Sequence, residues 1–513
     1  MNSAGIWILT AIVVYMLIVL AVGFFYARRN ESVGDFYLGG KRLGPIVTAM
    51  SAEASDMSSW LLMGLPGVAY LSGLAEAGWT MTGLAIGTYV NWLVVARRLR
   101  RYSQTAGNVI TLPEFFSNRY RDSRKLLTWV SAAVILIFFI PYTAAGFVSC
   151  GKLFNSVFGM DYTSAMLFGA LVIVAYTAVG GFLAASTTDL IQGIIMSIAL
   201  ISILIFGAAI AGGLGAVLEN TQALPGYLSM TLSHDAVSKT ASDYGPISII
   251  SAMAWGLGYF GMPHILLRFM AASDEKKLKL SRRVATFWVL VSLSVAVSIG
   301  IVGFCLSAMG LIPVLEGAAS ETVIIRIAEL LSREGVICAL AAGVVFSGIL
   351  AATMSTSDSQ LLVASSSVSE NLLRECFGLK LSDRATMIVA RVTVIVIAVV
   401  AAHIARNPDS SIFNVVSFAW AGFGAAFGPV MLFALFWRRS NLYGALAGMI
   451  TGGGMVFVWK YLVRPMGGVW DIYELLPAFI TACVFIVAVS LLTAPPSKEI
   501  TDEFETVSER AGA

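Results

Sequence analysis

Long apolar stretches separated by short polar segments dominate the chain. A membrane-spanning helix needs about 20 mostly apolar residues, and thirteen stretches of this kind follow one another here. The pattern therefore predicts an all-α membrane protein with about 13 transmembrane helices. The expected spans are 6–27, 45–70, 73–96, 126–150, 164–184, 189–212, 246–270, 284–310, 336–366, 386–405, 412–437, 442–463 and 473–493.

The distribution of lysine and arginine between the loops predicts the orientation. If the N-terminus lies outside, the segments that face the cytoplasm hold 24 of the 33 basic residues. Cytoplasmic loops carry the excess of positive charge in membrane proteins. We therefore expect the N-terminus outside and the C-terminus inside, which agrees with an odd number of spans. The cytoplasmic segments are 28–42, 97–125, 185–188, 271–283, 367–385, 438–441 and a polar tail, 494–513.

Composition narrows the class of protein. Hydrophobic residues make up 58% of the chain and charged residues 12%, against roughly 45–50% and 25% in soluble domains. The expected surroundings are a lipid bilayer, and no nucleic-acid partner is expected. The sequence has no GxxxxGK[ST] motif, which argues against ATP-driven transport, and no HExxH or GxSxG motif. We therefore expect a protein that is not an enzyme.

Two of the spans contain polar or glycine-rich interruptions. The second reads Ser51-Ala-Glu-Ala-Ser-Asp-Met-Ser-Ser-Trp60, which puts two acids at membrane depth. The seventh reads Trp255-Gly-Leu-Gly-Tyr-Phe-Gly-Met-Pro-His264. Unwound backbone in mid-membrane offers carbonyl groups to a cation and helix N-termini to an anion, as in secondary transporters. The alternative is that the glycines only allow close helix packing.

The spacing of the two interruptions predicts an inverted repeat. They lie five spans apart, and because five is odd, the second unit of five helices is inserted upside down relative to the first. Repeat one would cover about 45–212 and repeat two about 246–437. One extra helix, 6–27, then precedes the repeats, and two extra helices, 442–463 and 473–493, follow them.

Among the acids inside the predicted spans, we single out four as candidates: Glu53, Asp56, Asp189 and Asp358. Ionisable residues at membrane depth are costly and point to function. Asp189 has a second interpretation, because it opens the sixth span, where the helix dipole stabilises a negative charge.

The ninth span carries a hydroxyl-rich helix face. Ala352, Ser355, Thr356 and Ser359 are spaced i, i+3, i+4 and i+7, so they share one side. Sodium prefers oxygen ligands, and these hydroxyls together with carbonyls from a broken helix would form a small oxygen cage. Alternatively, the hydroxyls bond back to their own helix or join neighbouring helices.

The motifs resemble those of the sodium/solute symporter family, and of its proline-transporting branch, over essentially all thirteen spans. The matching stretches are Ser55-Asp-Met-Ser58 with Trp60-Leu-Leu-Met-Gly-Leu-Pro-Gly67, Gly180-Gly181-Phe182 with Thr188-Asp189, Trp255-Gly-Leu-Gly-Tyr-Phe-Gly261 with Pro263-His264, and Met354-Ser-Thr356 with Gln360. The resemblance implies a LeuT-type fold and sodium-coupled uptake of a small amino acid, proline in that branch, by a monomer in the bacterial inner membrane.

The resemblance also implies sites. A main sodium site would take carbonyls of Ala54, Met57 and Ala352 with hydroxyls of Ser355 and Thr356, and Asp56 matches a sodium-linked aspartate. A second sodium, present in some relatives, would use Asp189 with positions 355, 358 and 359. The residues that match substrate contacts are Ser58, Tyr142, Trp255, Tyr259, Met262 and Pro263.

Three residues depart from the proline branch. Glu53 stands where a small residue is usual, Asp358 where serine is usual, and Met262 where glutamine is usual. The first two bear on the number and type of coupling ions, and the third on the substrate. The alternative function is therefore sodium or proton symport of another small solute, such as another amino acid, betaine or an organic acid.

Overall fold

The structure is a computed structural model that describes residues 3–27, 33–235 and 238–509. It is built almost wholly of helices, with one antiparallel hairpin of strands β1 (Leu232–Asp235) and β2 (Thr240–Asp243). The first ten helices are α1 (Ser3–Ala27), α2 (Val33–Leu38), α3 (Pro45–Asp56), α4 (Leu65–Ser72), α5 (Leu74–Val90), α6 (Arg97–Thr105), α7 (Leu112–Arg119), α8 (Leu126–Phe158), α9 (Tyr162–Ile210) and α10 (Leu214–Gln222). The others are α11 (Pro246–Met253), α12 (Pro263–Ala271), α13 (Leu278–Ala308), α14 (Val323–Leu331), α15 (Val336–Ser366), α16 (Asp383–Ile404), α17 (Ile412–Phe436), α18 (Leu442–Val458), α19 (Leu475–Leu492) and α20 (Lys498–Glu509).

Every predicted apolar stretch coincides with helix, so the all-α membrane fold is confirmed. Among the described residues, nine helices are long and apolar enough to cross a membrane, and a bent pair makes a tenth. Two further apolar helices, Trp60–Ser72 and Tyr162–Ala178, are shorter. The number of thirteen spans, and the limits of the two repeats, stay predictions.

Both predicted interruptions are present. In the second span, α3 ends at Asp56 and helix resumes at Trp60. In the seventh span, α11 continues as a tighter 3₁₀ stretch, Ala254–Phe260, before α12 starts at Pro263, with a bend of 43°. Proline suits the first turn of a helix, because its missing N–H would have no partner there. The glycines and prolines of the sequence thus mark the breaks correctly.

The junction between the fifth and sixth spans differs from the prediction. We expected a loop at 185–188, but these residues are helical within α9. The chain instead turns at Gly181, whose φ of 69° lies in the left-handed region. A glycine adopts that conformation without the steric cost that a side chain imposes. The hydroxyl residues that follow therefore form the first turns of the second half of α9.

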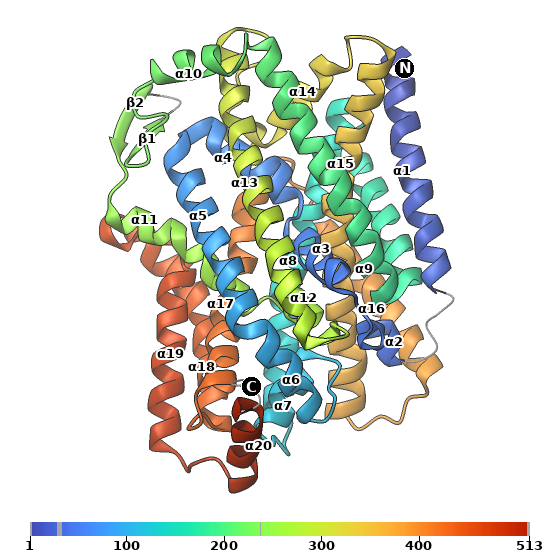
Figure 1. Cartoon of the computed structure of the whole chain (residues 1–513), viewed down its shortest axis with the longest axis vertical. Helices are drawn as coiled ribbons and strands as arrows, with labels where there is room; N and C mark the ends of the chain where they lie inside the picture. Colours follow the sequence, from blue (N-terminus) through green and yellow to red (C-terminus); the bar gives the residue numbers. More distant parts are fainter. Residues whose placement is uncertain (1–2, 28–32, 236–237, 510–513) are drawn as a thin grey trace.

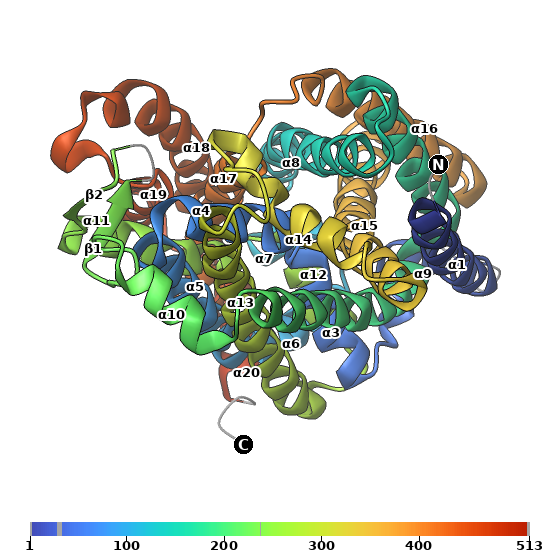
Figure 2. The same cartoon turned by 90° about the horizontal axis from the view of Figure 1, so that it is seen from above.

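The breaks lie in the middle of the molecule. In Figure 2, which views it from above, α3 and α12 lie between α1 and α16 on one side and α17, α18 and α19 on the other. In Figure 1 the hairpin and α10 lie at the upper end and α6, α7 and α20 at the lower end. The broken spans thus meet far from either end of the chain's long axis.

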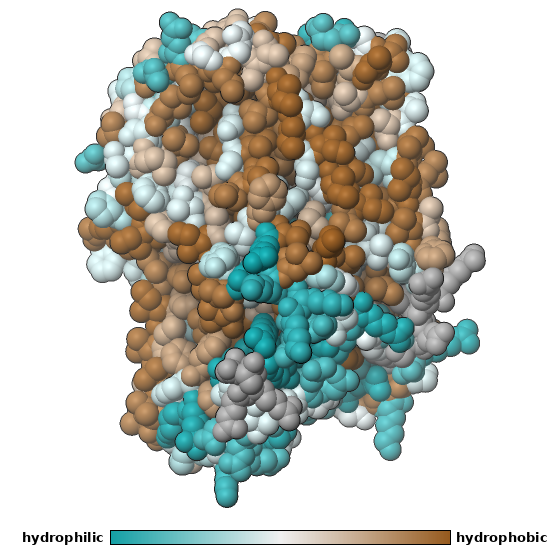
Figure 3. All heavy atoms as spheres, in the orientation of Figure 1, coloured by the Kyte–Doolittle hydropathy of each residue, from teal (hydrophilic) through white to brown (hydrophobic). Residues whose placement is uncertain are grey.

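The lower end is the more hydrophilic one. Figure 3 shows hydrophilic residues gathered there, whereas hydrophobic residues cover the flanks above. The tail, which we expected only to be polar, forms helix α20 and packs on this end through Ile500, Phe504 and Val507. Its Glu503 accepts a 2.6 Å hydrogen bond from Arg121, and the Arg98 guanidinium lies 5.1 Å from the Phe504 ring.

Candidate ion and substrate site

The break in the second span faces the hydroxyl face of α15. The Ser355 hydroxyl donates to the carbonyl oxygen of Ala54 at 2.7 Å and lies 3.2 Å from the Ala352 carbonyl of its own helix. Thr356 is the next residue, and its hydroxyl oxygen is buried without a hydrogen-bond partner. Met57 is the residue after α3 and is fully buried. The structure therefore brings oxygen groups of the predicted main sodium site together.

These groups fit a sodium ion chemically. Carbonyl and hydroxyl oxygens suit a hard cation, and the backbone at the end of α3 has carbonyls that lack helical partners. The unpartnered hydroxyl of Thr356 is a second indication, because buried polar groups without partners are rare in folded proteins.

Asp56 links the two broken spans. One of its carboxylate oxygens accepts a 2.7 Å hydrogen bond from the Tyr259 hydroxyl, which comes from the interruption in the seventh span. Its other carboxylate oxygen is buried without a partner. The Trp60 indole donates to the Asp56 carbonyl at 3.2 Å, and the Tyr142 hydroxyl approaches the same carbonyl at 3.5 Å. Ser58 lies in the same turn, where its hydroxyl accepts from the Trp60 backbone at 3.3 Å.

Aromatic rings surround Trp255 in the seventh span. Its ring stacks on Tyr473 with 5.2 Å between centroids and lies 5.0 Å from Phe413 and 6.0 Å from Trp60. The indole of Trp420 donates to the Trp255 carbonyl at 2.8 Å. Flat apolar walls with polar groups at one end are typical of small-molecule sites.

Three of these rings were not predicted from the sequence. Phe413 and Trp420 belong to α17, and Tyr473 lies just before α19, in a segment that we assigned to the extra helices. Tyr473 also donates a 2.6 Å hydrogen bond to the Ser417 carbonyl of α17. Trp420 stands in an apolar run, whereas Phe413 and Tyr473 have polar neighbours near the starts of α17 and α19. None of the three belongs to a motif that would indicate a site.

Glycines allow the seventh span to approach its neighbours. A Cβ atom on Gly256 would lie 2.2 Å from the Gly83 carbonyl oxygen of α5, and one on Gly258 would lie 1.9 Å from the Trp420 indole nitrogen. Both distances are far below contact, so a larger residue would push the interruption away. The close packing that we weighed as an alternative is therefore present here, and a role of this stretch in binding stays a prediction.

The remaining predicted substrate residues lie at the lower edge of the same interruption. Met262 is fully buried in an extended conformation, and Pro263 begins α12. They lie beyond the Trp255 and Tyr259 rings along the chain.

Asp189, Asp358 and Ser359 form a separate, deeply buried cluster together with Arg268. Arg268 donates to Asp189 at 3.1 Å and to the Ser359 hydroxyl at 2.6 Å. The Ser359 hydroxyl in turn lies 3.2 Å from an Asp358 carboxylate oxygen. Arg268 was not predicted as a site residue, although it is the one arginine within the predicted seventh span.

Glu53 directly precedes Ala54 of the candidate sodium site, but its side chain contacts Trp92, which lies just after α5. One carboxylate oxygen accepts a 2.8 Å hydrogen bond from the Trp92 indole, and the other has no partner. The residue is 1% exposed. The unusual acid is thus a buried group directly before Ala54, and not a surface residue.

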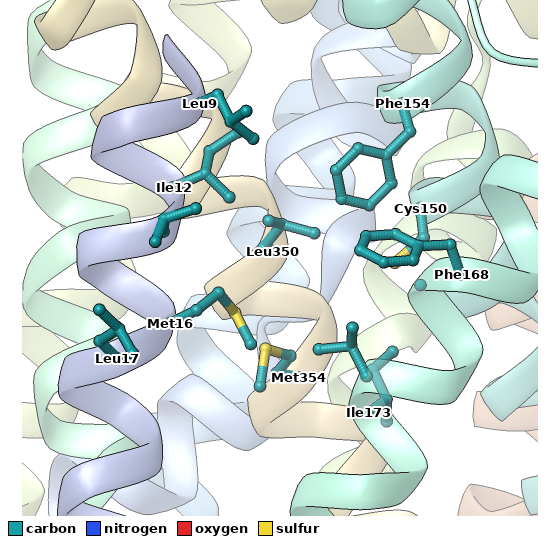
Figure 4. A pocket seen from close by; sticks show the side chains of 13 residues that line it. Leu9, Ile12, Met16, Leu17, Cys150, Phe154, Phe168, Ile173, Leu350 and Met354 are labelled. Carbon is teal, nitrogen blue, oxygen red and sulfur yellow. The ribbon is translucent and has the colours of Figure 1, made fainter. Parts of the chain in front are cut away.

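A cavity of about 270 Å³ lies apart from the candidate ion and substrate site, between α1, α8, α9 and α15. Figure 4 shows only apolar and sulfur-containing side chains around it, among them Ile12, Phe154, Leu350 and Met354. A zwitterion or an ion would find no polar group there. The cavity is therefore not a candidate for the transported solutes.

Two interrupted helices that meet at buried oxygen atoms and aromatic walls define a class of protein, the ion-coupled secondary transporters. Comparison with known sequences narrows the class. A sequence profile of the sodium:solute symporter family matches residues 36–452. The chain therefore belongs to the sodium:solute symporter family, and the resemblance seen in the motifs is confirmed.

Relatives match over nearly the whole length. The sodium/proline symporter of Haemophilus influenzae is 43% identical over 502 residues, with 96% of each chain covered. The sodium/proline symporter of Escherichia coli is 42% identical, covering 96% of this chain and 94% of the relative. The high-affinity proline transporter PutP of Bacillus subtilis is also 42% identical, with 94% and 98% covered.

Solved structures agree on the fold. A Na⁺-coupled sialic acid symporter in a substrate-bound, outward-open state superposes with a TM-score of 0.78 at 18% identity, covering 96% of this chain and 99% of the other. MhsT in complex with L-phenylalanine gives a TM-score of 0.55 at 13% identity, with 87% and 99% covered. The predicted LeuT-type fold is confirmed.

Proposed function

We propose that this protein is a sodium/proline symporter that carries L-proline into the bacterial cytoplasm together with sodium. One observation supports this most directly: a single short segment contacts both halves of the proposed site, through a backbone carbonyl and through a side-chain carboxylate. The Ala54 carbonyl faces Ser355 on the ion side, and the Asp56 carboxylate, two residues on, holds Tyr259 on the aromatic side. Names of relatives about 40% identical over nearly the full chain point to the same pair of solutes.

The proposed coupling follows from that shared segment. A sodium ion held by Ala54, Met57, Ala352, Ser355 and Thr356 would fix the break after α3 and therefore the position of Asp56. Asp56 would in turn hold Tyr259 against the substrate pocket. Each ligand then raises the affinity for the other, typically by 1–3 kcal/mol in coupled systems.

The energy for uptake would come from sodium. With the N-terminus outside and the C-terminus inside, a sodium ion enters along the membrane potential, which supplies about 2.3 kcal/mol per charge per 100 mV. Proline is a zwitterion and adds no net charge. Alternating access of a monomer in the cytoplasmic membrane would then concentrate proline inside the cell.

Proline suits the aromatic centre because its pyrrolidine ring is compact and apolar. Trp255, Trp60 and Tyr259 offer flat walls, while the unpartnered carboxylate oxygen of Asp56 leaves a polar acceptor close by. Met262 is the reason to keep a second candidate, another small solute such as alanine, betaine or an organic acid, because its thioether lacks the amide of the usual glutamine.

The test is uptake of radiolabelled proline into proteoliposomes that hold the purified protein. An inward sodium gradient should drive accumulation, and an equal potassium gradient should not. Proline analogues should compete strongly, whereas leucine and phenylalanine should compete weakly because of their volume. If alanine, betaine or an organic acid competes better than proline, the substrate assignment is wrong. If a proton gradient replaces sodium, the ion assignment is wrong.

A further inference from the structure

A polar pocket of about 310 Å³ lies where the junction of α5 and α6 meets the start of α13. Both segments that supply its charged residues, 97–125 and 271–283, belong to the side that we expect to face the cytoplasm. The lining has one acid, Glu275, and four cations: Arg97, Lys276, Lys279 and Arg282. The pocket therefore carries an excess of positive charge at a predicted membrane surface.

Glu275 compensates these cations only weakly, because it is paired with an arginine outside the lining. Arg101 donates to both carboxylate oxygens of Glu275, at 2.8 and 3.1 Å. The nearest nitrogen of Arg97 lies 4.0 Å from the same carboxylate. Lys276, Lys279 and Arg282 form no ion pair with any residue that the structure describes. The positive charge of the pocket thus remains available to a bound anion.

Arg282 is held by an aromatic ring and not by an acid. Its guanidinium carbon lies 5.3 Å from the centre of the Tyr89 ring of α5, which is a cation–π distance. Its Nε is buried without a hydrogen-bond partner, and so is the hydroxyl oxygen of Thr286, one turn further along α13. Buried polar atoms without partners are rare in folded proteins. These two atoms indicate that acceptor oxygens from outside the chain complete this part of the pocket.

An apolar row leads from the pocket along the flank of the molecule. Ile86, Tyr89 and Leu93 are spaced i, i+3 and i+7 on α5 and the helical stretch that follows it, so they share one side. These three side chains, together with Leu290 of α13, are between 43% and 50% exposed. Such a row is stable against lipid chains and unfavourable against water. A ligand with a charged head and an apolar chain would therefore use both surfaces, whereas a free phosphate would use only the pocket.

We propose that this pocket binds the headgroup of an anionic phospholipid, whose acyl chains lie on the exposed apolar row. Arg97, Lys279 and Arg282 bind the phosphate, because guanidinium and ammonium groups donate charge-assisted hydrogen bonds to phosphate oxygens. Basic pockets between transmembrane helices on the cytoplasmic side suit anionic headgroups. A zwitterionic lipid binds less well, since its own cation meets the positive charge of the lining. The bound lipid joins α6 to α13 at the membrane surface.

Native mass spectrometry of the purified protein in detergent tests the site, with dioleoylphosphatidylglycerol and dioleoylphosphatidylcholine as probes. The wild type should hold one phosphatidylglycerol molecule about tenfold more tightly than phosphatidylcholine. Arg97→Gln/Lys279→Gln/Arg282→Gln should bind phosphatidylglycerol about a hundredfold more weakly than the wild type, because each cation near the surface contributes about a factor of five.

The matched control removes the same charge elsewhere on the predicted cytoplasmic side. Arg124→Gln/Lys380→Gln/Arg384→Gln changes three exposed positions and should bind phosphatidylglycerol as the wild type does. An equal loss in the control would overturn the proposal, because the charge of the whole surface would then explain the binding. A pocket variant that elutes as a single monodisperse peak and keeps the wild-type affinity would also overturn it.

Two measurements on the wild type need no variant. Equal affinity for the two lipids would overturn the proposal, whether or not the variants fold. Inorganic phosphate and glycerol phosphate at millimolar concentration should leave phosphatidylglycerol bound. Displacement by either would assign the pocket to a soluble phosphate compound and would count against a lipid. Binding is measured without sodium or proline, so the result does not depend on the proposed transport function.

Discussion

The hydroxyl of Ser355 donates a 2.7 Å hydrogen bond to the carbonyl oxygen of Ala54, which joins α15 to the last turn of α3. A hydroxyl has one proton and two lone pairs and can turn. When a sodium ion enters, the proton must point elsewhere, and both oxygens can then face the ion. The contact therefore marks where an ion would replace a proton as the link between the two helices.

Thr356 is the first residue to test at this place. We expect Thr356→Val to raise the sodium concentration for half-maximal uptake by about tenfold or more, since a hydrogen bond or ligand to a charged group contributes about 1.5–3 kcal/mol and 1.4 kcal/mol is tenfold. Uptake of labelled proline across a sodium series measures it.

Thr353 offers the matched control for Thr356. It lies on the same helix, is equally buried, and its hydroxyl bonds back to the Ile349 carbonyl at 2.9 Å. Thr353→Val should leave the sodium requirement nearly unchanged. Equal sodium curves for Thr356→Val and the wild type would remove Thr356 from the ion site.

Tyr259 connects the ion side to the substrate side through Asp56. Tyr259→Phe removes the donor of a 2.7 Å bond and leaves both carboxylate oxygens without partners. We expect kcat/KM for proline to fall by about ten- to a hundredfold, because hydrogen bonds to charged groups contribute about 1.5–3 kcal/mol. The apparent sodium affinity should fall in the same variant.

The control is Tyr120→Phe, which removes another buried tyrosine bond, to Ser440 at 2.8 Å, far along the chain from either break. That variant should keep its proline kinetics. If Tyr259→Phe lowers the proline affinity while sodium affinity stays constant, Asp56 and Tyr259 do not couple the two solutes.

Much of this architecture could be predicted because the bilayer imposes simple rules. Spans need long apolar runs, and breaks within them need glycine, proline or polar residues, so both interruptions were found from the sequence. The hydroxyl face of the ninth span was equally visible, because helical spacing alone brings Ser355 and Thr356 to one side. The oxygen that Ser355 contacts, the Ala54 carbonyl, lies on a different helix. Only the family resemblance predicted that contact.

Other features depend on packing that local sequence does not encode. Arg268 follows an apolar run near a cytoplasmic loop, where arginines commonly extend to the membrane surface. Its burial follows from partners on α3, α9 and α15, which are distant in sequence. Tyr473 likewise stacks on Trp255 only because α19 packs on α17. By contrast, the spacing of Ile500, Phe504 and Val507 is helical and would have predicted α20.

Lys152 and Glu321 form a buried ion pair at the end opposite to α20. Their nitrogen and oxygen lie 2.7 Å apart, and the two side chains are 8% and 4% exposed. Glu321 also accepts from the backbone N–H of Ile412 and Phe413 at 3.0 Å each. It therefore fastens the 3₁₀ stretch Gly317–Thr322 to the start of α17.

Breaking this pair should destabilise the protein. Removing one partner of a buried pair typically costs about 3–5 kcal/mol, so Glu321→Gln should lower the apparent Tm in detergent by several degrees. Glu329→Gln is the control, because Glu329 pairs with Arg326 at a partly exposed site and such pairs contribute about 0–1 kcal/mol. Similar Tm values for both variants would mean that the buried pair contributes little.

Glu53 tests whether the unusual acid of this chain assists ion binding. Its carboxylate is buried directly before Ala54, and Trp92 donates to one oxygen at 2.8 Å. Two opposite charges several ångströms apart attract by a few kcal/mol at an effective dielectric constant of 20. Glu53→Gln keeps an acceptor for Trp92 and removes the charge, so we expect the sodium requirement to rise by tenfold or more.

Trp92→Phe is the control. It keeps the charge of Glu53 and loses only the donor, so its sodium requirement should change much less. If Glu53→Gln needs the same sodium concentration as the wild type, Glu53 carries no charge that acts on the ion, and its hydrogen bond with Trp92 has only a packing role.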